Sequence, residues 1–243
     1  MLEAVNLSAS YPAAPLFTGL NLTIPSGETA AILGPNGCGK STLLSLIAAQ
    51  KNPLDGSVKL SGRLIEKGDK RVGCILQTYG IFPWLTVEKN IRIALEIAGL
   101  DERVIRQKVL RIMDDFSISS LKERYPLSLS GGEKQKIALA RTMVSEPELL
   151  LMDEPFSAID ALTREELQDF LKTLLRSKKT ATLIVTHSIE EAAYLADTIY
   201  IMGDKPSAGF VSVYSSKQDF SDRKDPSFFL HISNIRKIME SAR

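Results

Sequence analysis

The pattern of apolar and polar positions along this chain predicts an α/β fold, because short apolar runs alternate with longer amphipathic segments. The runs at 29–33, 72–76, 149–152 and 181–186 are mostly apolar, which is typical of strands buried within a parallel sheet. Further strands are predicted at 2–9, 20–24, 58–60, 198–202 and, at a sheet edge, 210–214. Helices are predicted at 42–49, 160–176, 188–195 and 226–240.

The middle of the chain, residues 77–146, has no strand pattern. Val87, Ile91 and Leu95 recur at helical spacing, a second helix is predicted at 101–116, and a third ends near residue 144. We therefore expect one domain, 1–243. Its parts are an α/β core (about 1–76 and 147–204), an inserted helical subdomain (about 77–146), and a C-terminal edge strand and helix (about 205–243).

Composition narrows the class of protein. Of the 243 residues, 44% are hydrophobic and 24% are charged, as in folded globular proteins. The net charge of +1 argues against nucleic acid as the main partner, since that requires a basic stripe. No apolar run reaches the roughly 18 residues of a membrane span, and residues 1–4 do not resemble a signal peptide. Two cysteines are too few for a disulfide framework, so we expect both to be reduced thiols and the protein to lie on the cytosolic side of a cell.

Residues 34–42 match the phosphate-binding pattern G-x-x-x-x-G-K-[ST]. They are Gly34, Pro35, Asn36, Gly37, Cys38, Gly39, Lys40, Ser41 and Thr42. The stretch joins a predicted strand to a predicted helix, so glycines can turn backbone N–H groups toward an anion at a helix N-terminus. Lys40 is expected to reach the β- and γ-phosphates of a nucleotide, and the Ser41 hydroxyl is expected to bind Mg²⁺.

Polar residues also follow two of the buried strands. Asp153 and Glu154 end the apolar run 149–152, and His187 follows the run 181–186. Ligand-binding groups collect at the carboxyl ends of strands in open α/β sheets. Two adjacent carboxylates there suit Mg²⁺ and an attacking water, so these residues are predicted to complete the phosphate site.

Residues 130–133 form a second unusual stretch. Ser130 is placed to cap a helix, and Gly131 and Gly132 remove side chains from its first turn. One interpretation is a plain capped helix with Glu133 at its third position; the other is a second helix N-terminus open to an anion. The location between the phosphate loop and Asp153 favours the anion site.

These motifs, in this order, resemble those of the ATP-binding cassette (ABC) family of ATPase subunits, from Tyr11 to about Met202. The resemblance implies an ATPase that uses ATP and Mg²⁺, with a P-loop NTPase core, a mixed sheet and an antiparallel β edge. Glu133 and Ile159 replace the Gln and Leu that the family usually has, which are mild departures. In the nucleotide site, the resemblance implies that Tyr11 stacks on adenine, that residues 34–42 form the Walker A loop, and that the metal is bound by Ser41, Gln77 and Asp153. It implies that catalysis is carried out by Glu154, His187 and Gln77. It also implies that the partner's nucleotide is contacted by Ser130, Gly131, Gly132 and Glu133, and that Asp160 takes part in dimer communication.

The resemblance also implies partners. Residues 82–87 and 190–197 are similar to subunits that energise import of nitrate, sulfonates, taurine and pyrimidine precursors. Such a subunit is expected to form a head-to-tail homodimer around two ATP molecules. The dimer would bind membrane permease subunits, and through them a substrate-binding protein, at the cytoplasmic face of the membrane. Trp84 is then either an interface anchor or a core aromatic residue.

Two other functions remain as alternatives. A soluble ABC ATPase could act on DNA, ribosomes or iron–sulfur assembly, but this chain has neither heptad arms nor a second cassette. A small P-loop kinase would leave the stretch 130–132 and His187 without a role. The sequence does not identify the transported molecule, because other subunits select it.

Overall fold

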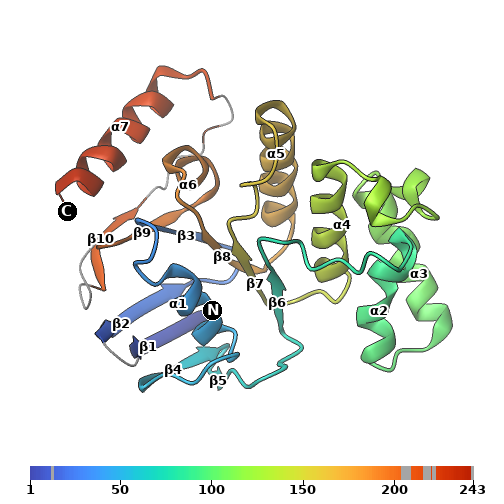
Figure 1. Ribbon diagram of the computed structural model, residues 1–243, viewed down its shortest axis with the longest axis horizontal. Helices are drawn as coiled ribbons and strands as arrows, with labels where there is room; N and C mark the ends of the chain where they lie inside the picture. The colour runs from blue at the N-terminus through green and yellow to red at the C-terminus, as the bar shows by residue number, and fades with distance from the viewer. Residues whose placement is uncertain (12–13, 204–208, 216–219, 221–222, 242–243) are drawn as a thin grey trace.

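The computed structural model describes residues 1–11, 14–203, 209–215, 220 and 223–241, and places them in two β-sheets flanked by helices (Figure 1). The larger sheet has the strand order β10-β9-β3-β8-β7-β6. Its strands are β3 (Thr29–Leu33), β6 (Val72–Ile75), β7 (Leu149–Asp153), β8 (Ala181–Val185), β9 (Thr198–Met202) and β10 (Phe210–Ser215). Only β10 pairs antiparallel with its neighbour, so the sheet is mixed, as predicted.

The smaller sheet is antiparallel, with the order β2-β1-β4-β5. Its strands are β1 (Leu2–Tyr11), β2 (Ala14–Ile24), β4 (Asp55–Leu60) and β5 (Arg63–Leu64). The sequence analysis missed β5 and the first half of β2. In that half, Pro15 and Gly19 (φ 64°) interrupt the alternation, and the register with β1 shifts. A proline is tolerated there because β2 is an edge strand.

The helices lie close to their predicted positions. They are α1 (Lys40–Ile47), α2 (Val87–Ile97), α3 (Glu102–Asp115), α4 (Gly131–Met143), α5 (Ala161–Ser177), α6 (Ile189–Leu195) and α7 (Pro226–Ser241), with short 3₁₀ turns at Ser119–Leu121 and Pro126–Ser128. The side chains of Thr86 and Asp101 accept hydrogen bonds from backbone N–H groups and so fix the starts of α2 and α3. Figure 1 shows α2, α3 and α4 gathered beside the edge of the sheet at β6.

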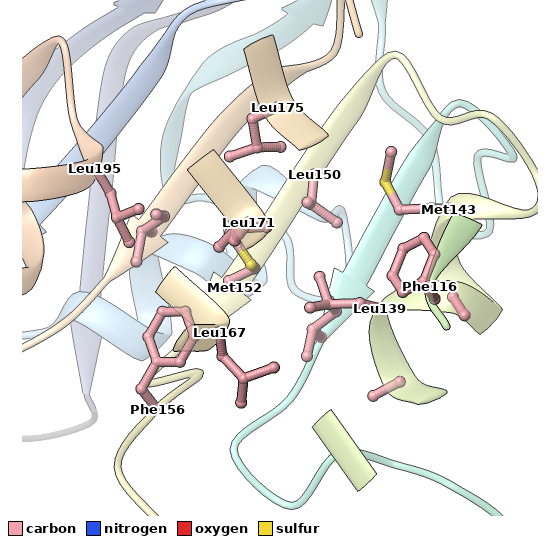
Figure 2. Packing of buried hydrophobic residues seen from close by; sticks show 14 of the residues in the cluster. Phe116, Leu139, Met143, Leu150, Met152, Phe156, Leu167, Leu171, Leu175 and Leu195 are labelled. Atoms are coloured by element: carbon pink, nitrogen blue, oxygen red, sulfur yellow. The ribbon is translucent and has the colours of Figure 1, made fainter. Parts of the chain in front are cut away.

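The larger sheet separates two hydrophobic clusters, and its strands contribute alternate residues to each. In β7, Leu149 and Leu151 belong to the cluster that contains α1 and the antiparallel sheet. Leu150 and Met152 belong to the cluster that contains α4, α5 and α6. Figure 2 shows this second cluster, with Leu167 and Leu171 of α5 near Met152. Because both faces are covered, the central strands are mostly apolar, and each fully buried leucine contributes about 1.5–3 kcal/mol.

The structure also places the aromatic side chains of His231 and Trp84. His231 in α7 is 4% exposed, and its Nδ1 lies 3.1 Å from the Tyr214 hydroxyl, so it serves in packing. Trp84 is 70% exposed and is tilted against the ring of Phe82, so the interpretation of Trp84 as a core residue is wrong. Among the residues that the structure describes, none of the helices has the length and apolar character needed to cross a bilayer.

Candidate functional site

The loop between β3 and α1 allows a ligand to approach its backbone closely. Gly39, just before α1, has a φ of 109°, a left-handed conformation that favours glycine. A Cβ on Gly39 would lie 2.9 Å from the side chain of Leu16, so the site excludes larger residues on steric grounds too. Within the described residues, Gly39 provides no side-chain cap for α1. A helix N-terminus of this kind is a position where anions bind.

Lys40 is buried within this loop, with 6% of its surface exposed. Its ammonium nitrogen donates hydrogen bonds to the carbonyl oxygens of Gly34, at 2.8 Å, and Pro35, at 2.7 Å. A buried cation needs such partners, because desolvation without them is costly. The lysine therefore holds the loop closed around itself and places its charge beside the start of α1.

Asp153 ends β7 next to this loop. Burial raises the pKa of its carboxyl, a hydrogen bond with the Ser41 side chain opposes that rise, and the charge of Glu154 reinforces it. The positive charge of Lys40 acts in the lowering direction. The Ser41 hydroxyl and the Asp153 carboxylate thus form a pair of oxygen donors, and oxygen is the ligand that Mg²⁺ prefers.

Glu154 follows directly, and its backbone is in the left-handed region with a φ of 45°. Such a conformation is uncommon for a residue with a side chain, and it concentrates at functional sites. The Glu154 N–H donates to the carbonyl of Val185 in β8, which anchors the turn. On one side, Gln77 Nε2 donates to Glu154 Oε2 at 3.4 Å; on the other, His187 Nδ1 lies 3.2 Å from Glu154 Oε1.

A short network after β8 holds His187 in place, and the sequence analysis did not find it. The Thr186 hydroxyl donates to Glu191 Oε2 at 2.6 Å, and it accepts from the N–H of Ser188 at 3.1 Å. Ser188 caps α6 by accepting from the N–H of Glu191. Burial raises the pKa of the Glu191 carboxyl, and its bond to Thr186 opposes this rise. The spacing Ser-x-x-Glu at the start of a predicted helix was the feature of the sequence that could have indicated this network.

The stretch 130–133 forms a complete capping box. The Ser130 hydroxyl accepts from the N–H of Glu133 at 3.2 Å, and Glu133 Oε2 accepts from the N–H of Ser130 at 2.8 Å. The glutamate that departs from the family pattern therefore stabilises the start of α4. The N–H groups of Gly131 and Gly132 are not engaged by this box, so the cap and the anion site are compatible.

The starts of α4 and α5 are packed together. A Cβ on Gly132 would lie 2.4 Å from the Cγ2 methyl of Thr163, so only glycine fits at that position. Asp160 caps α5 by accepting from the N–H of Thr163 at 3.1 Å. This bond lowers the pKa of the Asp160 carboxyl.

The predicted site residues thus fall into two groups. Lys40, Ser41, Gln77, Asp153, Glu154 and His187 are linked through the contacts described above. Ser130 and Asp160 start helices that pack on the opposite face of the large sheet from α1. Tyr11 ends β1, but its side chain lies outside the described part of the chain.

Comparison with known proteins gives a consistent result. The profile of the family described as "ABC transporter" matches residues 17–157. The aliphatic sulfonates import ATP-binding protein SsuB of Bacillus licheniformis is 43% identical over 187 residues, covering 77% of this chain and 72% of that protein. The taurine import ATP-binding protein TauB of Escherichia coli O157:H7 is 36% identical over 206 residues, covering 85% of this chain and 81% of that protein.

Solved structures resemble the fold closely. The ATP-binding cassette MJ0796, in a dimeric post-hydrolysis state with ADP and phosphate, has a TM-score of 0.77 and 25% identity, covering 90% of this chain and 100% of that one. CbiO1 of Clostridium perfringens, part of the ABC transporter complex CbiONQ, has a TM-score of 0.81 and 25% identity, covering 98% of both chains. The predicted fold class is therefore confirmed.

Proposed function

This chain belongs to the ABC transporter family, and we propose that it energises import of a sulfonate by hydrolysing ATP between two copies of itself. It is an ATP-binding, ATP-hydrolysing subunit of an importer. The soluble alternatives lose their support, because the similar proteins are named as import subunits. The observation that carries the mechanism below is the position of Glu154 between Gln77 and His187, beside the phosphate loop.

We propose that ATP binding is an exchange of partners at Lys40. Its ammonium now bonds to two loop carbonyls, and the β- and γ-phosphates would replace them. The N–H groups at the start of α1 would receive the same phosphates. The side chain of Tyr11 is the proposed contact for adenine.

The proposed Mg²⁺ ligands are Ser41, Asp153 and Gln77. A hydroxyl, a carboxylate and an amide oxygen make a donor set that fits this ion, and the Ser41 side chain is near enough to Asp153 to lower the pKa of its carboxyl. When bound, the ion would neutralise charge on the phosphates. Gln77, which also bonds to Glu154, would connect the metal to the water-handling residue.

Hydrolysis is assigned to Glu154, assisted by His187. The Glu154 carboxylate would accept a proton from a water molecule while the water oxygen bonds to the γ-phosphorus. The bond from that phosphorus to the bridging oxygen of ADP then breaks, and ADP and phosphate are the products. Glu154 is held from both sides and only 19% of its side chain is exposed, so it is positioned before the reaction.

The second half of each site is proposed to come from the partner copy. Ser130 to Glu133 start a helix that packs on the opposite face of the sheet from α1, which supports a contact between two chains rather than within one. In a head-to-tail dimer, the open N–H groups at Gly131 and Gly132 would face the other chain's γ-phosphate. Asp160, at the start of the adjacent α5, would lie at the same interface.

The proposed membrane partner is a permease that docks beside α2 at the cytoplasmic face, with a substrate-binding protein acting on the far side. A groove of about 620 Å³ lies here, lined mainly by apolar residues such as Leu76, Phe82 and Ile97. Trp84 stands exposed against Phe82. An exposed aromatic residue beside an apolar groove suits a protein partner.

The transported compound is proposed to be a small sulfonate. Two similar proteins are named for import of aliphatic sulfonates and of taurine, which itself carries a sulfonate group. Uptake of a labelled alkanesulfonate by cells that lack this chain tests the proposal. We expect uptake to be lost, to return with the native chain and not with Glu154→Gln, and sulfate uptake to stay unchanged. Loss of nitrate uptake with sulfonate uptake intact would contradict the assignment.

A further inference from the structure

We propose that Arg141 is a positioning residue that fastens the segment following Gln77 to the helix that begins at Ser130, so that both move as one body. The inference rests on the proposed function, because it concerns the contact that Ser130 makes with the partner's ATP. It assigns a role in the ATPase cycle to a residue that lies outside the phosphate site.

Arg141 is in the last turn of α4, and its guanidinium reaches the loop 79–82. Nη1 donates to the carbonyl of Gly80, and Nη2 donates to the carbonyl of Tyr79 at 3.4 Å. The guanidinium carbon also lies 5.5 Å from the centre of the Phe82 ring. Arg141 is half-buried, and this burial lowers the pKa of its guanidinium. A desolvated cation held by carbonyls and an aromatic face fixes those partners in return.

The loop needs such fixing, because its backbone is strained. Tyr79 and Gly80 have φ values of 61° and 62°, two left-handed residues in succession. The surrounding structure must hold a bulky residue in that conformation. Asn90, fully buried in α2, holds the next part of the segment by bonding to both the N–H and the carbonyl of Phe82. The segment is therefore attached to α2 and α4 together.

The same segment also touches the start of α4. A Cβ on Gly131 would lie 3.9 Å from the Tyr79 hydroxyl and 3.4 Å from the carbonyl of Ala158, just before Asp160. Within the described part of the chain, this buried hydroxyl has no hydrogen-bond partner. Tyr79 is thus linked to both ends of α4: its carbonyl accepts from Arg141 and its hydroxyl lies near Gly131. Those two positions are separated by a rise of about 15 Å for ten helical residues.

A movement at the proposed permease groove would therefore reach the partner's nucleotide through α4. Phe82 lines that groove and contacts Arg141. Because α4 is one continuous helix from Gly131 to Met143, a shift of the loop would carry Ser130 with it. Without Arg141 the two ends would move independently, and Ser130 would be misplaced in the closed dimer.

Arg141→Ala tests this, with Arg71→Ala as the matched control. Arg71 also donates to two backbone carbonyls, those of Leu60 in β4 and Leu64 in β5, but it lies outside α4. We expect Arg141→Ala to lower kcat about 10- to 100-fold with KM for ATP within about twofold, since misplacement acts on the closed state. Arg71→Ala should lower Tm without this loss of kcat. Arg141→Lys keeps the buried charge and the fold, yet should still lose kcat, because an ammonium does not form the two-carbonyl fork.

Amide hydrogen exchange supplies a second readout. In the native chain, ATP should slow exchange in 34–42, 78–82 and 130–134. In Arg141→Ala, ATP should still slow amide exchange in 34–42 but no longer in 78–82 or 130–134. Native kcat in both Arg141 variants, or a loss of kcat in Arg71→Ala as large as that in Arg141→Ala, would overturn the inference. If the native chain itself shows no ATPase activity, the proposed function has failed instead.

Discussion

The substitution Glu154→Gln should separate ATP binding from ATP hydrolysis. Gln has the same length and can adopt the same left-handed backbone at φ 45° about as readily as Glu. Its amide can still accept from Gln77 and meet His187, so the fold and the phosphate loop should be unchanged. What is lost is the ability to take a proton from water.

The size of the effect follows from that single loss. General base catalysis contributes about 10²- to 10⁴-fold to a rate. At about 1.36 kcal/mol per tenfold, the barrier should rise by roughly 3–5 kcal/mol. The hydrogen bonds of Glu154 to Gln77 and His187 are long, at 3.4 and 3.2 Å. Any change in these two bonds should therefore alter the activation barrier much less than the loss of the general base.

The assay is phosphate release at saturating ATP, together with ATP binding by fluorescence anisotropy. Glu148→Gln is the matched control, since Glu148 flanks the opposite end of β7 and bonds to Ser61. We expect Glu154→Gln to bind ATP, accumulate as a dimer on gel filtration and release almost no phosphate. A Glu154→Gln variant that turns over ATP within about threefold of the native rate would refute the role of this carboxylate.

Three further predictions concern the loop and the start of α4. Ser130→Arg should keep ATP binding by the monomer and abolish hydrolysis, and a loss of binding as large as that of a loop variant would contradict the contact in trans. Mg–ATP should slow alkylation of Cys38, seen by timed peptide mass spectrometry, whereas Cys74 should react slowly throughout, because burial raises its pKa to about 11. Gly132→Ala should lower the free energy of unfolding by about 1–3 kcal/mol in urea titration. Adding Thr163→Ser should restore stability, because it removes the methyl group 2.4 Å from the new Cβ; no recovery would show that the clash is not the cause.

Strong local patterns explain what could be predicted from the sequence. The phosphate loop depends on glycines and a lysine at fixed spacing, and buried strands such as 149–152 are recognisable by their apolar runs. These signals are local, so the fold class was accessible without coordinates, and the candidate site residues could be named from their spacing.

Other features depend on contacts between distant residues. The short β5 has no pattern of its own and exists because Lys59 pairs with Leu64. The network of Thr186 and Glu191 that holds His187 depends on the turn after β8. The hydrogen bond from Arg141 to the Gly80 carbonyl joins residues 61 positions apart. Trp84 was ambiguous because an aromatic residue suits a core and an interface equally, and only its exposure decides.

The alternation of β7 between two hydrophobic clusters has a consequence for genetics. Leu151 and Met152 are neighbours in sequence, but they pack against entirely different partners. Second-site suppressors of a damaging change at Leu151 should therefore arise around α1 and the antiparallel sheet. Suppressors for Met152 should arise in α4 and α5. A pairwise mutational scan of this strand should show two interleaved networks of epistasis, with adjacent residues less coupled than residues two apart.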